Sequence, residues 1–134
     1  RKLMDVSLQN IDDYTKDLSW MLKALVQIER EFQSQSWVFT KPVHAQTAFE
    51  DIEQQLEPKI TALIAQRGHA YFKQMLYRID LSERQIAKAF TLTIDANFTH
   101  VLSNLIVKRC LQKVLIRNYY KSPEKDALGS SLEE

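Results

Sequence analysis

The chain has 134 residues, of which 45% are apolar and 26% are charged, and its formal net charge is +1. These values are ordinary for one globular domain, so we expect a single helical domain over 1–121 and a polar, disordered tail over 122–134. Only two Gly and three Pro are present, which disfavours a fold rich in strands because such folds need frequent turns. The sequence therefore predicts an all-α fold, a bundle of four to five helices.

The first predicted helix spans about 5–32 and is one of two long helices, the other spanning about 95–121. Its apolar residues follow alternating steps of three and four, which is the spacing of a heptad seam. The residues on this seam are Met4, Ile11, Tyr14, Leu18, Met21, Leu25, Ile28 and Phe32. Such a face is buried inside its own bundle or pairs with a second copy, so a homodimer is one expected outcome.

An apolar triplet, Trp37-Val38-Phe39, stands in the polar connection after the first predicted helix, ahead of Pro42. Two interpretations stay open. The triplet either seals the end of the bundle as a lid, or its aromatic side chains anchor a partner protein, since aromatic residues dominate interface energetics. The second interpretation makes Trp37, Val38 and Phe39 the predicted partner-binding residues.

The next helix is predicted over about 47–67. Thr47-x-x-Glu50 has the spacing of a capping box, in which each side chain satisfies a free backbone N–H of the other residue. Pro58 removes one backbone donor from the helix, so we expect a kink or a new start there. Gly68 is predicted to end the helix as a C-terminal cap.

Two further short helices are predicted over about 69–79 and 83–91, and the second opens with another capping box, Ser82-x-x-Gln85. A longer stretch, 82–106, resembles the helix-turn-helix DNA-binding pattern over some twenty residues.

In this resemblance Gln85 to Phe90 corresponds to the first helix, with Ala87 at the small-residue position, and Leu92-Thr93 to the start of the second. Thr91 stands at the turn, where Gly usually allows a left-handed backbone, and Asn97 stands where an apolar residue usually locks the helices together. The resemblance implies a degenerate helix-turn-helix that binds DNA.

The charge distribution is uneven. The segment 61–121 holds ten Lys/Arg against three Asp/Glu, a balance of +7, whereas 1–60 and 122–134 each have a balance of −3. A positive segment of this size needs a negative counterpart, either in the same molecule or in another one.

Four bases of the last predicted helix follow i,i+4 spacing, and a fifth stands beside them. They are Arg109, Lys113, Arg117 and Lys121, with Lys108 as the fifth, and we call them the basic fan. One interpretation is that they contact the phosphates of a nucleic acid. The other is that they complement the helix dipole and are neutralised by acids of the first helix. Those acids are Asp5, Asp12, Asp13 and Asp17.

We find no catalytic or cofactor-binding pattern. The three histidines are scattered, without the spacing of metal ligands. They are His44, His69 and His100. Glu50 and Glu53 share a helix face, as solvated carboxylates commonly do. We therefore expect no enzymatic activity, no cofactor, no metal and no small-molecule ligand.

Cys110 is the only cysteine, so a disulfide within the chain is excluded. Its apolar neighbours predict an inert thiol in the core. A chain with a single cysteine fits a reducing compartment, so we expect a cytoplasmic location. No run of 18 apolar residues exists, so we expect no membrane span.

Together these observations favour a non-enzymatic helical module that binds another protein or itself. The alternative is a nucleic-acid-binding protein that uses the basic segment. The response to salt separates the two hypotheses, because phosphate binding weakens steeply with salt whereas apolar association changes little.

Overall fold

The computed structural model describes residues 11–92 and 98–120. Within these ranges it contains helices and no strand, so the all-α prediction is confirmed. The α-helices are α1 (Leu18–Glu31), α2 (Ala48–Arg67), α3 (His69–Arg78), α4 (Glu83–Leu92) and α5 (Phe98–Tyr120); the 3₁₀ helices are η2 (Ile11–Tyr14) and η3 (Gln33–Gln35). The predicted tail over 122–134 lies outside the described residues.

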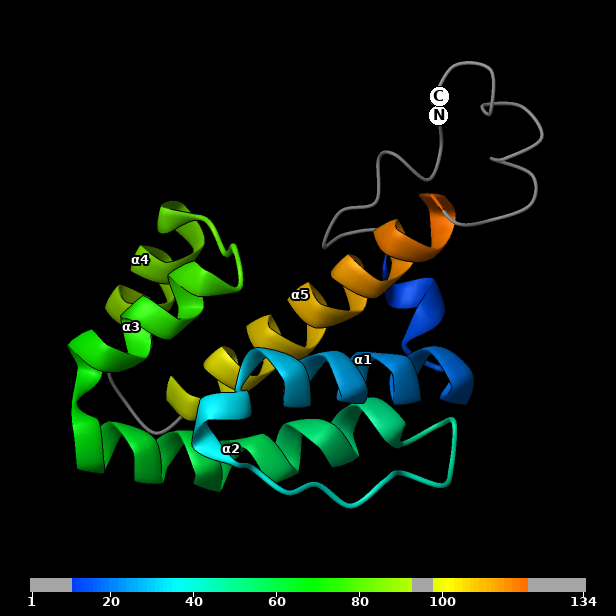
Figure 1. Cartoon of the computed structure of the whole chain (residues 1–134), viewed down its shortest axis with the longest axis horizontal. Helices are drawn as coiled ribbons and strands as arrows, with labels where there is room; N and C mark the ends of the chain where they lie inside the picture. Colours follow the sequence, from blue (N-terminus) through cyan, green and yellow to red (C-terminus); the bar gives the residue numbers. More distant parts are fainter. Residues whose placement is uncertain (1–10, 93–97, 121–134) are drawn as a thin grey trace.

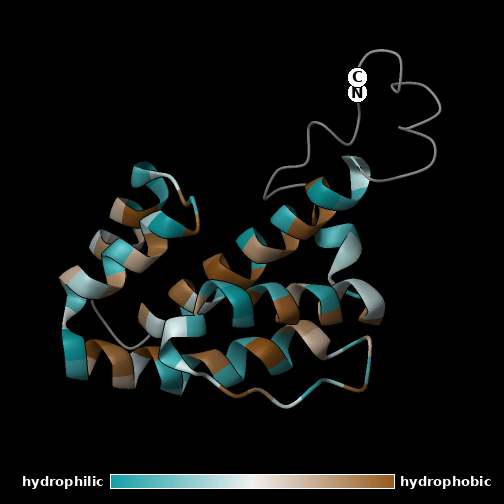
Figure 2. Cartoon of the chain, viewed as in Figure 1, coloured by the Kyte–Doolittle hydropathy of each residue, from teal (hydrophilic) through white to brown (hydrophobic). Residues whose placement is uncertain are grey.

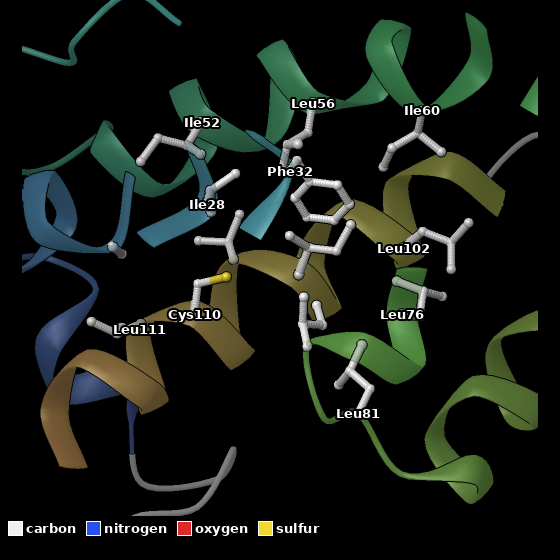
Figure 3. Packing of buried hydrophobic residues seen from close by; sticks show 14 of the residues in the cluster. Ile28, Phe32, Ile52, Leu56, Ile60, Leu76, Leu81, Leu102, Cys110 and Leu111 are labelled. Carbon is white, nitrogen blue, oxygen red and sulfur yellow. The ribbon is translucent and has the colours of Figure 1, made fainter. Parts of the chain in front are cut away.

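Helices α1, α2 and α5 form the main bundle, in which α5 packs on both of the others (Figure 1). Each helix carries alternating apolar and polar bands rather than being apolar all round (Figure 2). The apolar bands meet in one core, where Ile28, Leu56 and Leu102 have no exposed surface (Figure 3). Burying one such side chain contributes about 1.5–3 kcal/mol, which is the main force that holds the three helices together.

The first long helix was predicted to begin too early. In the structure Ile11–Tyr14 is a separate 3₁₀ turn, and α1 begins at Leu18. Asp17 has an extended backbone, and its carboxylate accepts a hydrogen bond from the Trp20 backbone N–H at 3.1 Å. This N-cap fixes the start of the helix. Both apolar residues of the 3₁₀ turn still pack on the core, so the apolar spacing over 5–32 did not reveal the break.

Helix α2 spans the range that was predicted, but its start and its middle differ in detail. The Thr47 hydroxyl donates to the Asp51 carboxylate at 3.4 Å and does not form the predicted capping box. The helix also continues through Pro58 without a new start, because buried residues on both sides hold it against the core. Gly68 ends α2 with φ of 92°, a conformation that glycine adopts easily.

Helices α3 and α4 form a hairpin beside the main bundle (Figure 1). The turn between them contains Asp80 at φ 69°, and the predicted capping box follows it. The Ser82 backbone N–H donates to Gln85 Oε1, and the Gln85 backbone N–H donates to Ser82 Oγ, both at 3.0 Å. An aromatic cluster of His69, Phe90 and Phe98 then joins the hairpin to the start of α5, with ring centroids 5.0–5.9 Å apart.

The predicted helix-turn-helix has the wrong register. Thr91, expected at the tight turn, lies inside α4, and Leu92 ends that helix instead of opening a second one. The Thr91 hydroxyl donates to the Lys88 carbonyl at 3.2 Å, so this β-branched residue is accommodated within the helix. The last helix was predicted over 95–121, and its described part is Phe98–Tyr120.

Candidate functional site

The connection between α1 and α2 is the most exposed apolar part of the described chain. It begins after Ser36, whose left-handed backbone (φ 55°) turns the chain out of η3. Residues 37–43, here called the 37–43 segment, contain no helix or turn and run along the outer side of α2 (Figure 1). Apolar stretches appear along this trace (Figure 2).

The two aromatic residues of the segment turn towards the protein. Trp37 stacks on the buried ring of Phe32, with centroids 4.8 Å apart and an interplanar angle of 17°. Phe39 meets Trp37 edge-on at 6.4 Å, and Lys59 Nζ lies 4.8 Å from the centroid of the Phe39 ring. Both aromatic side chains are half-buried. For these two residues the geometry is that of the predicted lid.

Val38 and Val43 point the other way. The exposed fraction is 81% for Val38 and 70% for Val43, whereas the neighbouring Pro42 is buried. The predicted partner-binding triplet is therefore divided: its central valine faces solvent, and the two rings beside it fix the backbone on the core. Val43, which lies outside the triplet, was not identified from the sequence.

A side-chain amide holds the middle of the segment. The Thr40 backbone N–H donates to Gln55 Oε1, and Gln55 Nε2 donates to the Thr40 carbonyl oxygen, both at 2.8 Å. Gln55 belongs to α2 and offers one acceptor and two donors, so it binds the segment as a neighbouring strand would. The sequence contains no local signal for this pairing, since the two residues are 15 positions apart.

Open depressions lie where the segment meets α2. One, of about 340 Å³, includes Trp37, Pro58 and Ala62 in its lining, and another, of about 390 Å³, includes Pro42 and Val43. Both are shallow rather than enclosed, which fits contact with a protein surface better than capture of a small molecule.

The basic fan of α5 contacts the protein itself. Lys113 Nζ lies 2.5 Å from Glu31 Oε2 and 3.5 Å from Asp80 Oδ2. Arg109 donates through Nε to the Ile79 carbonyl at 3.1 Å, and another of its guanidinium nitrogens lies 4.0 Å from Asp80 Oδ2. These contacts use α1 and the α3–α4 turn, and they draw the two cations away from bulk solvent.

The remaining members of the fan differ in their surroundings. The Arg117 guanidinium donates to the side-chain carbonyl of Gln27, and Gln27 Nε2 donates to Glu31 Oε2 at 2.7 Å. The side chain of Lys108 is half-buried, and no hydrogen bond or ion pair joins it to another described side chain. Lys121 lies outside the described residues.

Among the described residues, Asp12, Asp13 and Asp17 form no ion pair with the fan, and Asp5 lies outside the described residues. Lys113 meets Glu31 while Arg117 meets Gln27, so α1 and α5 run antiparallel and the second half of α5 faces the end of α1. Asp12, expected to contribute, is exposed at the opposite end of that region. The fan therefore uses Glu31 together with Asp80 from the hairpin turn.

A second polar cluster joins α2 to α5 and was missed. Glu53 is only 4% exposed, and Asn104 Nδ2 donates to its Oε2 at 2.9 Å. Burial raises the pKa of the Glu53 carboxyl above its ordinary value. Nearby, His100 Nδ1 lies 2.9 Å from Glu57 Oε2, and this hydrogen bond raises the pKa of the His100 imidazole.

The position of Glu53 contained a signal that could have been used. Glu53 follows Phe49 by four residues and precedes Leu56 by three, and both of these apolar residues are buried. Glu53 therefore lies at the border of the apolar face of α2 rather than on its solvated side.

No group of three or more His, Cys, Asp or Glu in the described part of the chain is arranged to hold a metal ion.

Cys110 is fully buried in the core (Figure 3). Burial raises the pKa of its thiol well above the ordinary value, so the reactive thiolate is not populated at neutral pH. No helix among the described residues combines the length and the apolar character that crossing a membrane requires.

Comparisons with protein-family models, with curated proteins and with solved structures give no match to this chain.

Proposed function

We propose that the chain is a non-enzymatic helical module that associates with a second copy of itself through the 37–43 segment. The observation that carries this proposal is the exposure of two valines on a firmly held backbone. Self-association is one of the two forms of protein binding that the sequence predicted. The 37–43 segment suits it because it presents apolar side chains and backbone groups together.

The exposed apolar residues of the described chain are few, which makes their distribution informative. They are Val26 (52%), Val38 (81%), Val43 (70%), Tyr77 (38%) and Tyr120 (40%). Single exposed apolar residues need no explanation, but the two most exposed ones share one short segment.

The backbone that carries these valines is already ordered. The Trp37 ring stacks on the core, and Gln55 binds both backbone groups of Thr40. Association loses affinity when a flexible loop must first become ordered, and this segment avoids most of that cost. Firm anchoring next to exposed apolar side chains therefore supports a binding role over a purely structural one.

The contacts of the basic fan do not favour the nucleic-acid alternative. Lys113 and Arg109 are engaged by Glu31, Asp80 and the Ile79 carbonyl. A phosphate would have to replace these partners, and the gain from releasing counterions would be reduced by the bonds that are lost. We therefore do not propose α5 as a phosphate-binding helix.

The test is sedimentation equilibrium of the wild-type chain and of a double variant, Val38→Asp with Val43→Asp. A short interface of this type predicts a dissociation constant of about 1–100 μM for the wild-type dimer. Two buried carboxylates at the interface should leave the double variant monomeric at the same concentrations.

Val26→Asp is the matched control, because Val26 is also an exposed valine but lies on α1. It should dimerise as the wild type does. A wild-type chain that stays monomeric at about 0.5 mM would contradict the proposal. Equal effects of Val26→Asp and of the double variant would show that the 37–43 segment has no special role.

A further inference from the structure

We infer that three exposed bases of the α3–α4 hairpin, Arg78, Arg84 and Lys88, contact the phosphates of a single nucleic-acid strand. This inference goes beyond the self-association proposed above and does not rest on it. It places phosphate contacts on the hairpin, whereas the sequence analysis placed them on the basic fan of α5.

The hairpin carries more positive charge than its own acids neutralise. The stretch 67–92 contains five bases and two acids, a balance of 5 − 2 = +3. The bases are Arg67, Lys73, Arg78, Arg84 and Lys88, and the acids are Asp80 and Glu83. None of these bases forms an ion pair with a described residue, and four of the five are exposed.

One of the two acids is engaged by α5 instead of by the hairpin. Asp80 Oδ2 lies 3.5 Å from Lys113 Nζ and 4.0 Å from a guanidinium nitrogen of Arg109. Arg84 follows Asp80 by four residues, but no ion pair joins the two. The contact that neutralises the basic fan therefore leaves the hairpin bases without a counterpart in the described chain. A surplus of this kind attracts a polyanion.

Two of the five bases are held by rings of the protein itself. The guanidinium carbon of Arg67 lies 4.0 Å from the centroid of the Tyr71 ring. Lys73 Nζ lies 5.1 Å from the centroid of the Phe90 ring. Cation–π attraction stabilises both positions. We therefore assign the phosphate contacts to the three bases that have no such ring contact.

The hairpin brings these three bases into one region. Arg78 ends α3, and Arg84 is the second residue of α4, so both lie close to the turn that joins the two helices (Figure 1). Lys88 follows Arg84 by four residues and shares its helix face. The rise between these two is about 6 Å. The charges along one strand of duplex DNA are about 3.4 Å apart, so two bases at this separation can contact phosphates close to each other along a strand.

An exposed ring beside these bases favours a nucleic-acid strand over an acidic protein. Tyr77 is 38% exposed and directly precedes Arg78 on α3. Unpaired bases stack on aromatic side chains, and proteins that bind single strands combine such rings with positive charge. An acidic protein surface would be attracted by the cations alone. The combination of ring and cations therefore identifies a single strand as the occupant.

The experiment titrates a labelled, mixed-sequence single-stranded DNA of about 20 nucleotides with the full chain at about 50 and 200 mM salt. The test variant is the triple substitution Arg78→Gln, Arg84→Gln and Lys88→Gln. Three phosphate contacts on a single strand contribute about −2 to the log–log slope, so the slope of the variant should be shallower by about two units. Its affinity at the lower salt should be at least about tenfold weaker.

The matched control removes three bases from another region, by Lys16→Gln, Lys23→Gln and Arg30→Gln. These residues are exposed and the change in net charge is the same, but residues 11–31 contain five acids against these three bases. The control should bind the strand as the wild type does. Circular dichroism checks that both triple variants keep their helices.

A single substitution tests the ring. Tyr77→Leu should weaken binding severalfold without changing the salt slope, because the ring contributes stacking and no charge. An unchanged affinity for Tyr77→Leu, together with equal affinity of the wild type for duplex and single-stranded DNA, would show that a single strand is not the occupant.

Two results would overturn the inference as a whole. One is a wild-type chain that does not bind the strand at the lower salt, which would direct attention to an acidic protein as the occupant. The other is an equal loss of affinity in the hairpin and control variants, which would show that only net charge matters. Neither result depends on whether the chain dimerises, so this inference and the proposed function can fail separately.

Discussion

Replacement of Lys113 by methionine tests whether the basic fan is a structural part of the bundle. Lys113 Nζ lies 2.5 Å from Glu31 Oε2, and the two side chains are 20% and 16% exposed. Exposed ion pairs contribute about 0–1 kcal/mol, whereas removing one member of a buried pair costs about 3–5 kcal/mol. This pair lies between the two cases, so we expect the free energy of unfolding to fall by about 2 kcal/mol.

The assay is urea unfolding followed by circular dichroism at low salt. Lys108→Met is the matched control, because Lys108 lies on the same helix and has no ion-pair partner among the described residues. It should change the stability by less than about 0.5 kcal/mol. The double variant Glu31→Met with Lys113→Met should be more stable than the sum of the single effects predicts, since no unpaired carboxylate remains.

A cost for Lys113→Met no larger than that of the control would refute this reasoning. The lysine would then be free to contact a ligand, and the nucleic-acid hypothesis for α5 would regain its main support.

Two further predictions concern pH and salt. Glu53 and His100 both have raised pKa values in the folded state, the first through burial and the second through its hydrogen bond to a carboxylate of α2. The folded state therefore holds more protons than the unfolded one above the ordinary values of 4.5 and 6.5, so the free energy of unfolding should fall as the pH rises through both regions. Urea titrations across this range should show a weaker decline at the acidic end for Glu53→Gln; an unchanged decline would contradict the assignment. For salt, titrations of mixed-sequence duplex DNA should give the same log–log slope for Arg117→Gln as for the wild type, because α1 already binds that guanidinium. A slope smaller by about one unit would show that Arg117 contacts phosphate. The slope for Lys88→Gln, a variant on the exposed side of α4, is measured for comparison.

Local signals in the sequence were reliable where neighbouring residues satisfy each other's hydrogen-bonding groups. Ser82 and Gln85 form their capping box because both partners lie within one turn. Gly68 ends α2 because only its own backbone has to adopt the positive φ. The start of α1 was missed for the opposite reason. Asp17 has an extended backbone and precedes the helix, but the apolar spacing continues across it. A periodic pattern of apolar residues therefore does not reveal where the backbone stops being helical.

The contacts of the candidate site depend on helices that are distant in the sequence. Gln55 reaches Thr40 only after α2 has folded beside the connection, and no spacing rule predicts that pair. The division of the apolar triplet into two half-buried rings and one exposed valine could have been predicted from the sequence, since residues of an extended chain alternate between its faces. Treating Trp37, Val38 and Phe39 as one apolar group obscured that alternation.

The antiparallel packing of α5 on α1 also determines when the protein can fold. The contacts that close the core join residues separated by 82 and 90 positions, so they span most of the chain. During synthesis α1 and α2 emerge first, but the face that they share remains open until α5 is available. The α3–α4 hairpin, by contrast, is built from local contacts and can form early. Folding rates fall as contacts become less local, so formation of the α1–α5 pair is expected to be the slow step. A chain released before α5 would expose its apolar faces to aggregation.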